Sequence, residues 1–179
     1  MNQSQGVDNE EIRNLICSAL REFYIHDADM IDYLSEVPIS IRIGMHIFKT
    51  CACLEKLGYR VDCEYDKAAM QPKPAPEGYR HKHMRPDILI HKRAAINEPY
   101  NIGNLLFCEI KKNNISNEDK EKIEYSLSDD FNYQIAISIH HIRKDSIYIS
   151  WFEKSKFDVI EKCIKYKFTN MQLVEETGL

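Results

Sequence analysis

Two short apolar runs that carry ionised residues constrain this chain more than any other feature. They are Asp87–Lys92 and Leu105–Lys111. Each is bounded by turn residues, which is typical of a buried β-strand. Glu109 and Lys111 lie two positions apart, so on a strand they project from the same face. Because burying unpaired charge costs free energy, we interpret Asp87, Glu109 and Lys111 as a metal site with a lysine beside it.

Hydrophobic periodicity predicts the other elements. Helices are expected at Glu10–Phe23, Ile39–Leu57 and Asn117–Leu127, and further strands at Tyr59–Tyr65, Tyr133–Ile142 and Ser146–Phe152. A short helical piece or turn is expected at Ile25–Leu34, and a helix or short terminal segment at Lys154–Ile164. The order helix, three strands, helix, two strands predicts an α/β fold, a mixed sheet with helices packed on its faces.

Polar residues in front of each periodic run predict where the helices begin. The candidate capping residues are Asp8 or Asn9 for the first, Ser35 or Glu36 for the second, and Ser116 or Asn117 for the third. Gly58 is a typical C-terminal stop for the second helix.

Composition limits the class of protein. The 179 residues suit one domain, 1–179, and the 44% hydrophobic and 29% charged content is that of a globular chain. The net charge of −4 does not by itself indicate a nucleic-acid binder, although local patches matter more than the sum. No segment approaches the apolar length that crosses a bilayer, and the polar N-terminus is unlike a signal peptide. We therefore expect a cytoplasmic protein without a membrane partner.

Cysteine and histidine spacing does not favour a zinc site, because CxxC pairs are absent from the sequence and His81 and His83 lack ligand partners at suitable spacing. The six cysteines are read as free thiols. The linker Asp66–Met84 contains several prolines and most of the concentrated basic residues. It is either a flap that grips phosphate or a solvated connection, and both interpretations stay open.

The motifs Pro86-Asp87 and Glu109-Ile110-Lys111, in this order of elements, resemble the PD-(D/E)XK phosphodiesterase superfamily. That superfamily has the restriction-endonuclease-like fold with an αβββαβ core. More narrowly, the segments around Asp62, Asp87 and Glu109 are similar to a small uncharacterised bacterial family within it. The resemblance covers roughly residues 35 to 150, and its specificity comes from motif and element order together.

The resemblance implies a role for each site residue. Asp87 and Glu109 would bind magnesium or manganese, with the carbonyl of Ile110 as a further ligand. Lys111 would position the attacking water or activate it. It can act as a base on that water if the pKa of its ammonium group is depressed. Glu36 would assist from the first core helix, or would only be an acid that interacts with the helix dipole.

Simpler interpretations exist for the remaining charged residues. Glu64 is read as part of a solvated strand face, and Lys112, Lys92 and Arg93 as surface charges. For Lys122 and Tyr125 a solvated helix face is preferred over a position in the cleft. His140 and His141 are read as edge and core residues rather than catalytic ones.

The expected function is that of a magnesium-dependent nuclease, an endonuclease-like hydrolase that acts on DNA rather than RNA. The alternative is a catalytically inactive module of the same fold that binds nucleic acid or protein and regulates. A third idea is a dimeric scaffold, suggested by the apolar content and Trp151, so a homodimer is a possible assembly.

Overall fold

The computed structural model describes residues 6–63, 67–68, 71–72, 85–93, 99, 101–156 and 158–176, with the backbone alone at 67–68 and 71–72. Its helices are α1 (Asn9–Asp27), η1 (Ala28–Met30), α2 (Glu36–Thr50), η2 (Cys51–Leu57) and α3 (Asn117–Ser126), where η marks a 3₁₀ helix. Its strands are β1 (Arg60–Cys63), β2 (Lys67–Ala68), β3 (Gln71–Pro72), β4 (Ile88–His91), β5 (Asn104–Ile110), β6 (Ile135–His140), β7 (Ser146–Lys154), β8 (Val159–Thr169) and β9 (Gln172–Glu175).

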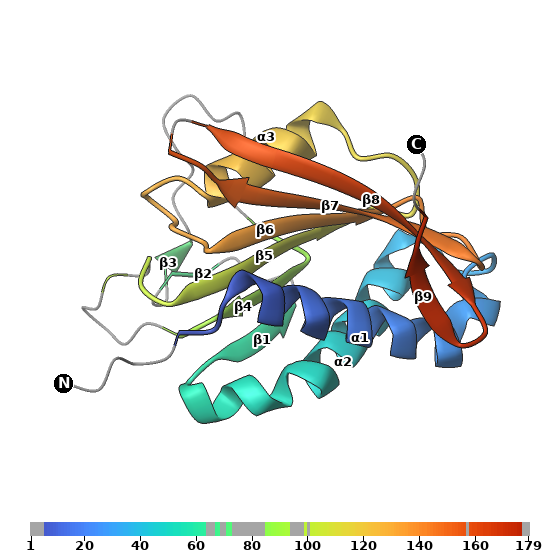
Figure 1. The fold of residues 1–179 in the computed structure, drawn as a ribbon. Helices are drawn as coiled ribbons and strands as arrows, with labels where there is room; N and C mark the ends of the chain where they lie inside the picture. The colour runs from blue at the N-terminus through green and yellow to red at the C-terminus, as the bar shows by residue number, and fades with distance from the viewer. Residues whose placement is uncertain are drawn as a thin grey trace.

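A seven-stranded mixed sheet organises the described part of the chain (Figure 1). The strand order is β1-β4-β5-β6-β7-β8-β9, while β2 and β3 form a separate pair. Neighbouring strands are antiparallel except β5 and β6, which are parallel. The crossover between β5 and β6 contains α3, as a parallel connection requires. The fold is therefore mixed α/β, as predicted.

The two faces of the sheet pack against different helices (Figure 1). On one face, Cys108 and Ile110 of β5 join the core formed with α1 and α2. On the other face, Phe107 packs in a smaller cluster with Ile123 of α3. This division follows from the alternation of side chains along a strand, and it makes β5 buried along its whole length. Any charged residue on β5 is consequently buried as well.

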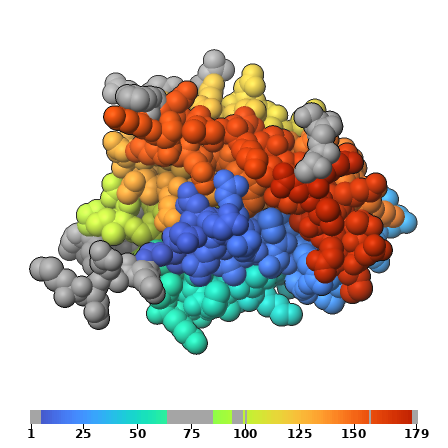
Figure 2. Space-filling model, in the orientation of Figure 1, coloured from blue at the N-terminus to red at the C-terminus, as the bar shows by residue number. Residues whose placement is uncertain are grey.

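Helix α1 lies between α2 and the C-terminal strands (Figure 2). The Tyr24 hydroxyl lies within hydrogen-bond distance of the carbonyl oxygens of Arg143 and Ser146, at 2.9 and 2.7 Å. Arg21 Nε donates to the carbonyl of Met171 at 2.8 Å, which ties α1 to the β8–β9 turn. These contacts join the first helix to segments distant in the sequence.

Helix starts agree with the capping predictions. Asp8 caps α1 through a hydrogen bond from the backbone N–H of Glu11, and Ser35 occupies the N-cap position of α2. Ser116 and Asp119 form a reciprocal capping box at the start of α3. Gly58 ends the second helical stretch with a φ of 87°, a conformation that favours glycine.

Two predictions of secondary structure were wrong. Ile39–Leu57 is not one α-helix, because it changes to the 3₁₀ helix η2 at Cys51. Lys154–Ile164 is not a helix: β7 extends to Lys154, and β8 begins at Val159. β8 pairs with β7 from Lys154↔Val159 to Ser146↔Lys167, so strand pairing overrides local helix preference there.

The helical stretch Glu36–Leu57 also corrects the expectation about apolar length. Its 22 residues have a hydropathy of 1.2 and are long and apolar enough to cross a membrane, with 33% of the tested window buried inside the protein. The reason is that α2 carries apolar residues on two sides, with Ile39 and Ile43 buried but Ile41 and Met45 exposed. A single helix of this kind is weak support for a membrane span, because core helices pass the same test.

His140 brings a titratable group into the interior at the end of β6. It is 7% exposed, and its Nε2 lies 3.3 Å from Ser150 Oγ. Burial and the neighbouring His141 and Lys120 lower the pKa of His140 to about 4, against an opposing effect of Glu161. The imidazole is therefore neutral in the folded protein at neutral pH.

The lowered pKa of His140 should make stability depend on pH. Because the unfolded chain takes up this proton more readily, the free energy of unfolding should fall as the pH drops from about 6.5 towards 4. The wild type should lose about 2 kcal/mol more than His140→Gln between pH 7.5 and 4.5. Urea unfolding at both values measures this difference. His26→Gln, at an exposed site, should keep the wild-type loss, and equal losses in His140→Gln and wild type would contradict the assignment.

Candidate active site at the end of β5

Strands β4 and β5 bring Asp87 and Glu109 to the same end of the sheet. The two strands are antiparallel, with Ile88 opposite Cys108 and Leu89 opposite Phe107. Continuing this register by one residue places Asp87 opposite Glu109. Alternation puts Glu109 on the face of the sheet that α3 covers, and Asp87, directly before β4, also borders a hollow lined by residues of α2. Two acids far apart in the sequence are thus neighbours across one strand pair.

Asp87 is fixed by the backbone of β5. Its Oδ2 accepts a hydrogen bond of 2.6 Å from the N–H of Ile110. Burial raises the pKa of Asp87, and the charge of Glu36 acts in the same direction, while the Ile110 N–H and the ammonium groups of Lys111 and Lys122 lower it; the net shift is upward. Asp87 therefore lies within the electrostatic field of several charged groups at this end of β5.

Glu109 is the most deeply buried member of the site, with 2% of its side chain exposed. Burial raises its pKa to about 8, and the nearby charge of Asp87 also raises it. The ammonium of Lys122 acts in the opposite direction and forms an ion pair with Glu109 Oε1. A buried carboxyl group whose pKa is raised by a neighbouring carboxylate marks a place where a cation is electrostatically favoured.

Lys111, directly after β5, lies between two carboxylates. Its Nζ is 3.4 Å from Glu36 Oε1 and 3.6 Å from Asp119 Oδ1. Burial acts to lower the pKa of Lys111, but Asp119 and Glu36 outweigh it, so the pKa is raised. In the protein without a bound metal ion, Lys111 therefore lacks the depressed pKa that a general base requires. Lys111 is an ammonium group that can donate hydrogen bonds and offset negative charge.

Glu36 does more than interact with its own helix dipole. Located in the first turn of α2, it contacts Lys111 through one carboxylate oxygen and accepts from the backbone N–H of Lys112 through the other, at 3.1 Å. It thereby connects α2 to the end of β5. Of the two interpretations open for Glu36, this contact supports the one in which it belongs to the site.

The prediction that Lys122 lies on a solvated helix face was wrong. Its side chain is 16% exposed, pairs with Glu109, and donates to the carbonyl oxygen of Arg85 at 2.7 Å. The short polar helix α3 packs on this face of the sheet, so a residue in its middle reaches the buried end of β5. Asp119 was not singled out as a site residue at all. Its place in a Ser-x-x-Asp capping pattern that begins six residues beyond β5 is the signal that could have identified it.

The other charged residues have different positions. Lys112 is not merely a surface charge, because its Nζ donates to the carbonyl of Leu34 at 2.6 Å. Arg93 pairs with Asp62, whose carboxylate also bonds His91. Lys92 lies over the ring of Tyr59. Glu64 lies outside the described residues, and so does the linker Asp66–Met84 apart from the backbone at 67–68 and 71–72.

A divalent cation at this site would need oxygen ligands from the side chains around it. Within the ranges that the structure describes, no group of three or more His, Cys, Asp or Glu residues is placed to hold a metal ion. The pair Asp87 and Glu109 nevertheless supplies hard carboxylate oxygens, and magnesium commonly takes one or two carboxylates and completes its shell with water and substrate. The pair therefore fits magnesium or manganese. The role of the Ile110 carbonyl as a ligand stays a prediction.

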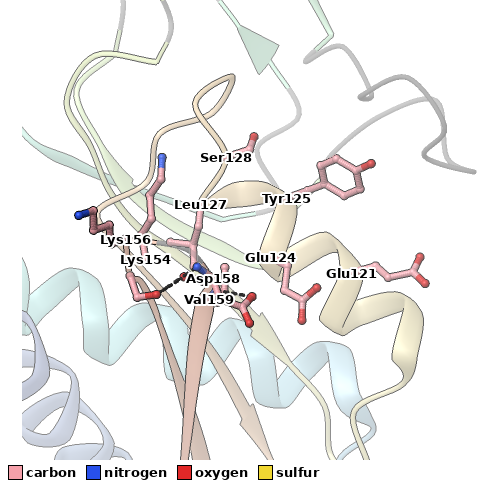
Figure 3. Close-up of a pocket in the computed structure, with 10 residues that line it drawn as sticks. Glu121, Glu124, Tyr125, Leu127, Ser128, Lys154, Lys156, Asp158 and Val159 are labelled. Atoms are coloured by element: carbon pink, nitrogen blue, oxygen red, sulfur yellow. Dashed lines mark hydrogen bonds between the residues drawn. The ribbon is translucent and has the colours of Figure 1, made fainter.

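Two of the hollows on the surface of the described residues bear on the candidate site. One, of about 270 Å³, is lined by Asp87 together with Val37, Ser40, Ile41 and Cys63, so the candidate site borders accessible space. The other, of about 500 Å³, lies between α3 and the β7–β8 turn (Figure 3). Its lining includes Glu121, Tyr125 and Lys154 but neither Asp87 nor Glu109, so it is separate from the candidate site.

Comparison with protein-family models, with curated proteins and with solved structures finds no match for this chain. The assignment of a function therefore rests on the site itself.

The bond between Asp87 and Ile110 should contribute to stability. Asp87→Ala should lower the free energy of unfolding by about 1 to 3 kcal/mol, because a buried N–H loses its acceptor. Asp87→Asn keeps an acceptor oxygen and should cost less. Urea unfolding of both variants, with the exposed Asp130→Ala as control, measures the difference. Equal losses for the alanine and asparagine variants would show that this hydrogen bond is unimportant.

Proposed function

We propose that this protein is a metal-dependent phosphodiesterase of the PD-(D/E)XK type that hydrolyses nucleic acid. One observation carries the proposal: Asp87 and Glu109 lie at one end of adjacent strands, and Lys111 follows on the same strand edge. Two hard carboxylates next to an ammonium group are the components that phosphodiester hydrolysis needs. Glu36 supports them from the neighbouring helix.

The order of the elements also supports the proposal. The segment α2, β1, β4, β5, α3, β6 follows the αβββαβ order of that superfamily, and its four strands are adjacent in one sheet. The parallel pair β5 and β6 is the part of the sheet joined through α3. On this interpretation, α1 and the strands β7 to β9 are additions that extend the core.

The mechanism assigns a task to each side chain. Asp87 and Glu109 would hold magnesium or manganese, which when bound supplies charge stabilisation for the phosphoryl oxygens and lowers the pKa of water. Lys111, as an ammonium with a raised pKa, orients the attacking water and offsets charge that develops on the phosphoryl group. Glu36 positions Lys111 through the 3.4 Å contact. Lys111 therefore assists as a hydrogen-bond donor rather than as a base.

The proposed substrate is DNA rather than RNA, following the resemblance of the motifs. The net charge of −4 means that binding depends on local groups rather than on the overall field. Lys111 and Lys122 are the cationic side chains that lie beside the candidate metal ligands among the described residues.

A second candidate is a nuclease-fold module that binds nucleic acid or protein without cleaving it. The observation that favours it is the ion pair between Lys122 and Glu109, because an ammonium can serve as the permanent counter-ion of that carboxylate. Calorimetric titration with Mn²⁺ distinguishes the candidates. The phosphodiesterase requires a site that Asp87→Ala removes, whereas the module requires none.

Replacing Lys111 tests the catalytic assignment. Lys111→Ala should reduce the rate of DNA cleavage with magnesium or manganese by about 100-fold or more, because a positioned donor is lost from the transition state. The circular dichroism spectrum should stay that of the wild type. The exposed Lys162→Ala variant on β8 serves as the matched control and should cleave normally.

Two results would overturn these assignments. If the wild type cleaves neither DNA nor RNA with either metal and shows no calorimetric binding of Mn²⁺, the phosphodiesterase proposal fails. Cleavage of RNA alone would reject DNA as the substrate and leave the reaction class intact.

A further inference from the structure

The side chain of Lys122 occupies the position where a cation at Glu109 would lie. Its ammonium contacts Glu109 Oε1, the carboxylate oxygen exposed to no solvent, and donates to the carbonyl of Arg85. The second bond anchors the ammonium next to Asp87, which is two residues from Arg85. Lys122 is therefore inserted between the backbone before β4 and the carboxylate on β5.

The charges at this end of the sheet are divided between two ammonium groups. Lys111 is shared by Glu36 and Asp119, and Lys122 is paired with Glu109. Asp87 instead accepts a hydrogen bond from the backbone N–H of Ile110, and among the described residues it forms no direct ion pair with an ammonium group. Each of the four carboxylates thus has a cationic or N–H partner within the protein. A divalent cation at Asp87 and Glu109 therefore competes with these partners for the carboxylate oxygens.

Lys122 is the partner that competes most directly with a metal ion on Glu109, because its ammonium contacts Oε1 of that carboxylate. A metal ion on either oxygen of Glu109 would lie close to this ammonium, and two cations on one carboxylate repel each other strongly at low dielectric. Lys111 does not contact Glu109 in this arrangement, so it can stay between Glu36 and Asp119. The flexible four-carbon stem of a lysine allows the ammonium to move while α3 stays in place.

We propose that Lys122 is a tethered counter-cation of Glu109, which holds the site in the metal-free protein and is displaced when a divalent metal binds. This inference rests on the proposed function, because it requires a metal site at Asp87 and Glu109. It adds a property to that site: metal affinity is set by competition with a side chain of the same protein. The displaced ammonium stays beside the site, where it can form an ion pair with an anionic substrate.

Lys120 provides a matched control on the same helix. It pairs with Glu161 of β8 at 2.9 Å, and its side chain is 38% exposed, so it bears the same charge without contact to the candidate ligands. Replacing either lysine by methionine changes the net charge of α3 by the same amount. An effect seen at Lys122 alone therefore reports the contact with Glu109.

The experiment measures Mn²⁺ binding by calorimetry to the full chain and to the variants Lys122→Met and Lys120→Met. Lys122→Met should bind Mn²⁺ about 10- to 100-fold more tightly than the wild type, the range of affinity change typical of groups that contact a metal ligand. Lys120→Met should bind as the wild type does. In a thermal-shift assay, Mn²⁺ should raise the Tm of Lys122→Met more than that of the wild type.

A measurement on the wild type keeps the test independent of how the variant folds. Lysine acetylation, followed by mass spectrometry, should label Lys122 slowly without metal and faster with Mn²⁺, while the labelling of Lys120 stays constant. Unchanged labelling of Lys122 in the presence of bound Mn²⁺ overturns the inference.

The possible failures are distinguishable. If wild type and Lys122→Met bind Mn²⁺ with equal affinity, the counter-cation role is wrong and the metal site stands. If Mn²⁺ binds to neither protein, the proposed function fails, and this inference fails with it.

Discussion

The buried carboxyl group of Glu109 is the constraint on which the candidate site depends. A carboxylate that is 2% exposed would be costly without a partner, and the ammonium of Lys122 supplies one from α3. This ion pair links the middle of α3 to the end of β5, next to the apolar contact between Ile123 and Phe107. Packing and charge compensation therefore place the same helix on the same strand.

Such an arrangement is poorly explained by stability alone, because an apolar residue at position 109 would need no compensating lysine. Burial, together with the charge of Asp87 beside it, raises the pKa of Glu109 to about 8 against the opposing effect of Lys122. Clusters of acids with raised pKa are more common at functional sites than elsewhere. The protein keeps this buried ionisable group at the point where Glu36, Lys111 and Asp87 also meet, which is the physical basis for proposing chemistry there.

Much of the architecture could be predicted from local pattern. The apolar run in Leu105–Lys111 and the capping signals at Asp8 and Ser116 correspond to elements that the structure contains. The C-terminal region could not, because β8 is a strand through pairing with β7 along its length, and local preference carries no information about that partner. For the same reason, the strand β9 was not anticipated.

The sequence by itself determined which residues are available for the site: Asp87 at the start of one buried strand, and Glu109 and Lys111 two positions apart on another. A strand pattern is a local property of the sequence, so these two strands could be predicted without knowing which strands pair with them. Only the tertiary structure decided how their charges are balanced, with Lys122 on Glu109 and Lys111 between Glu36 and Asp119. Ion pairs of this kind depend on which helix packs on which face of the sheet, and that depends on contacts between segments far apart in the chain.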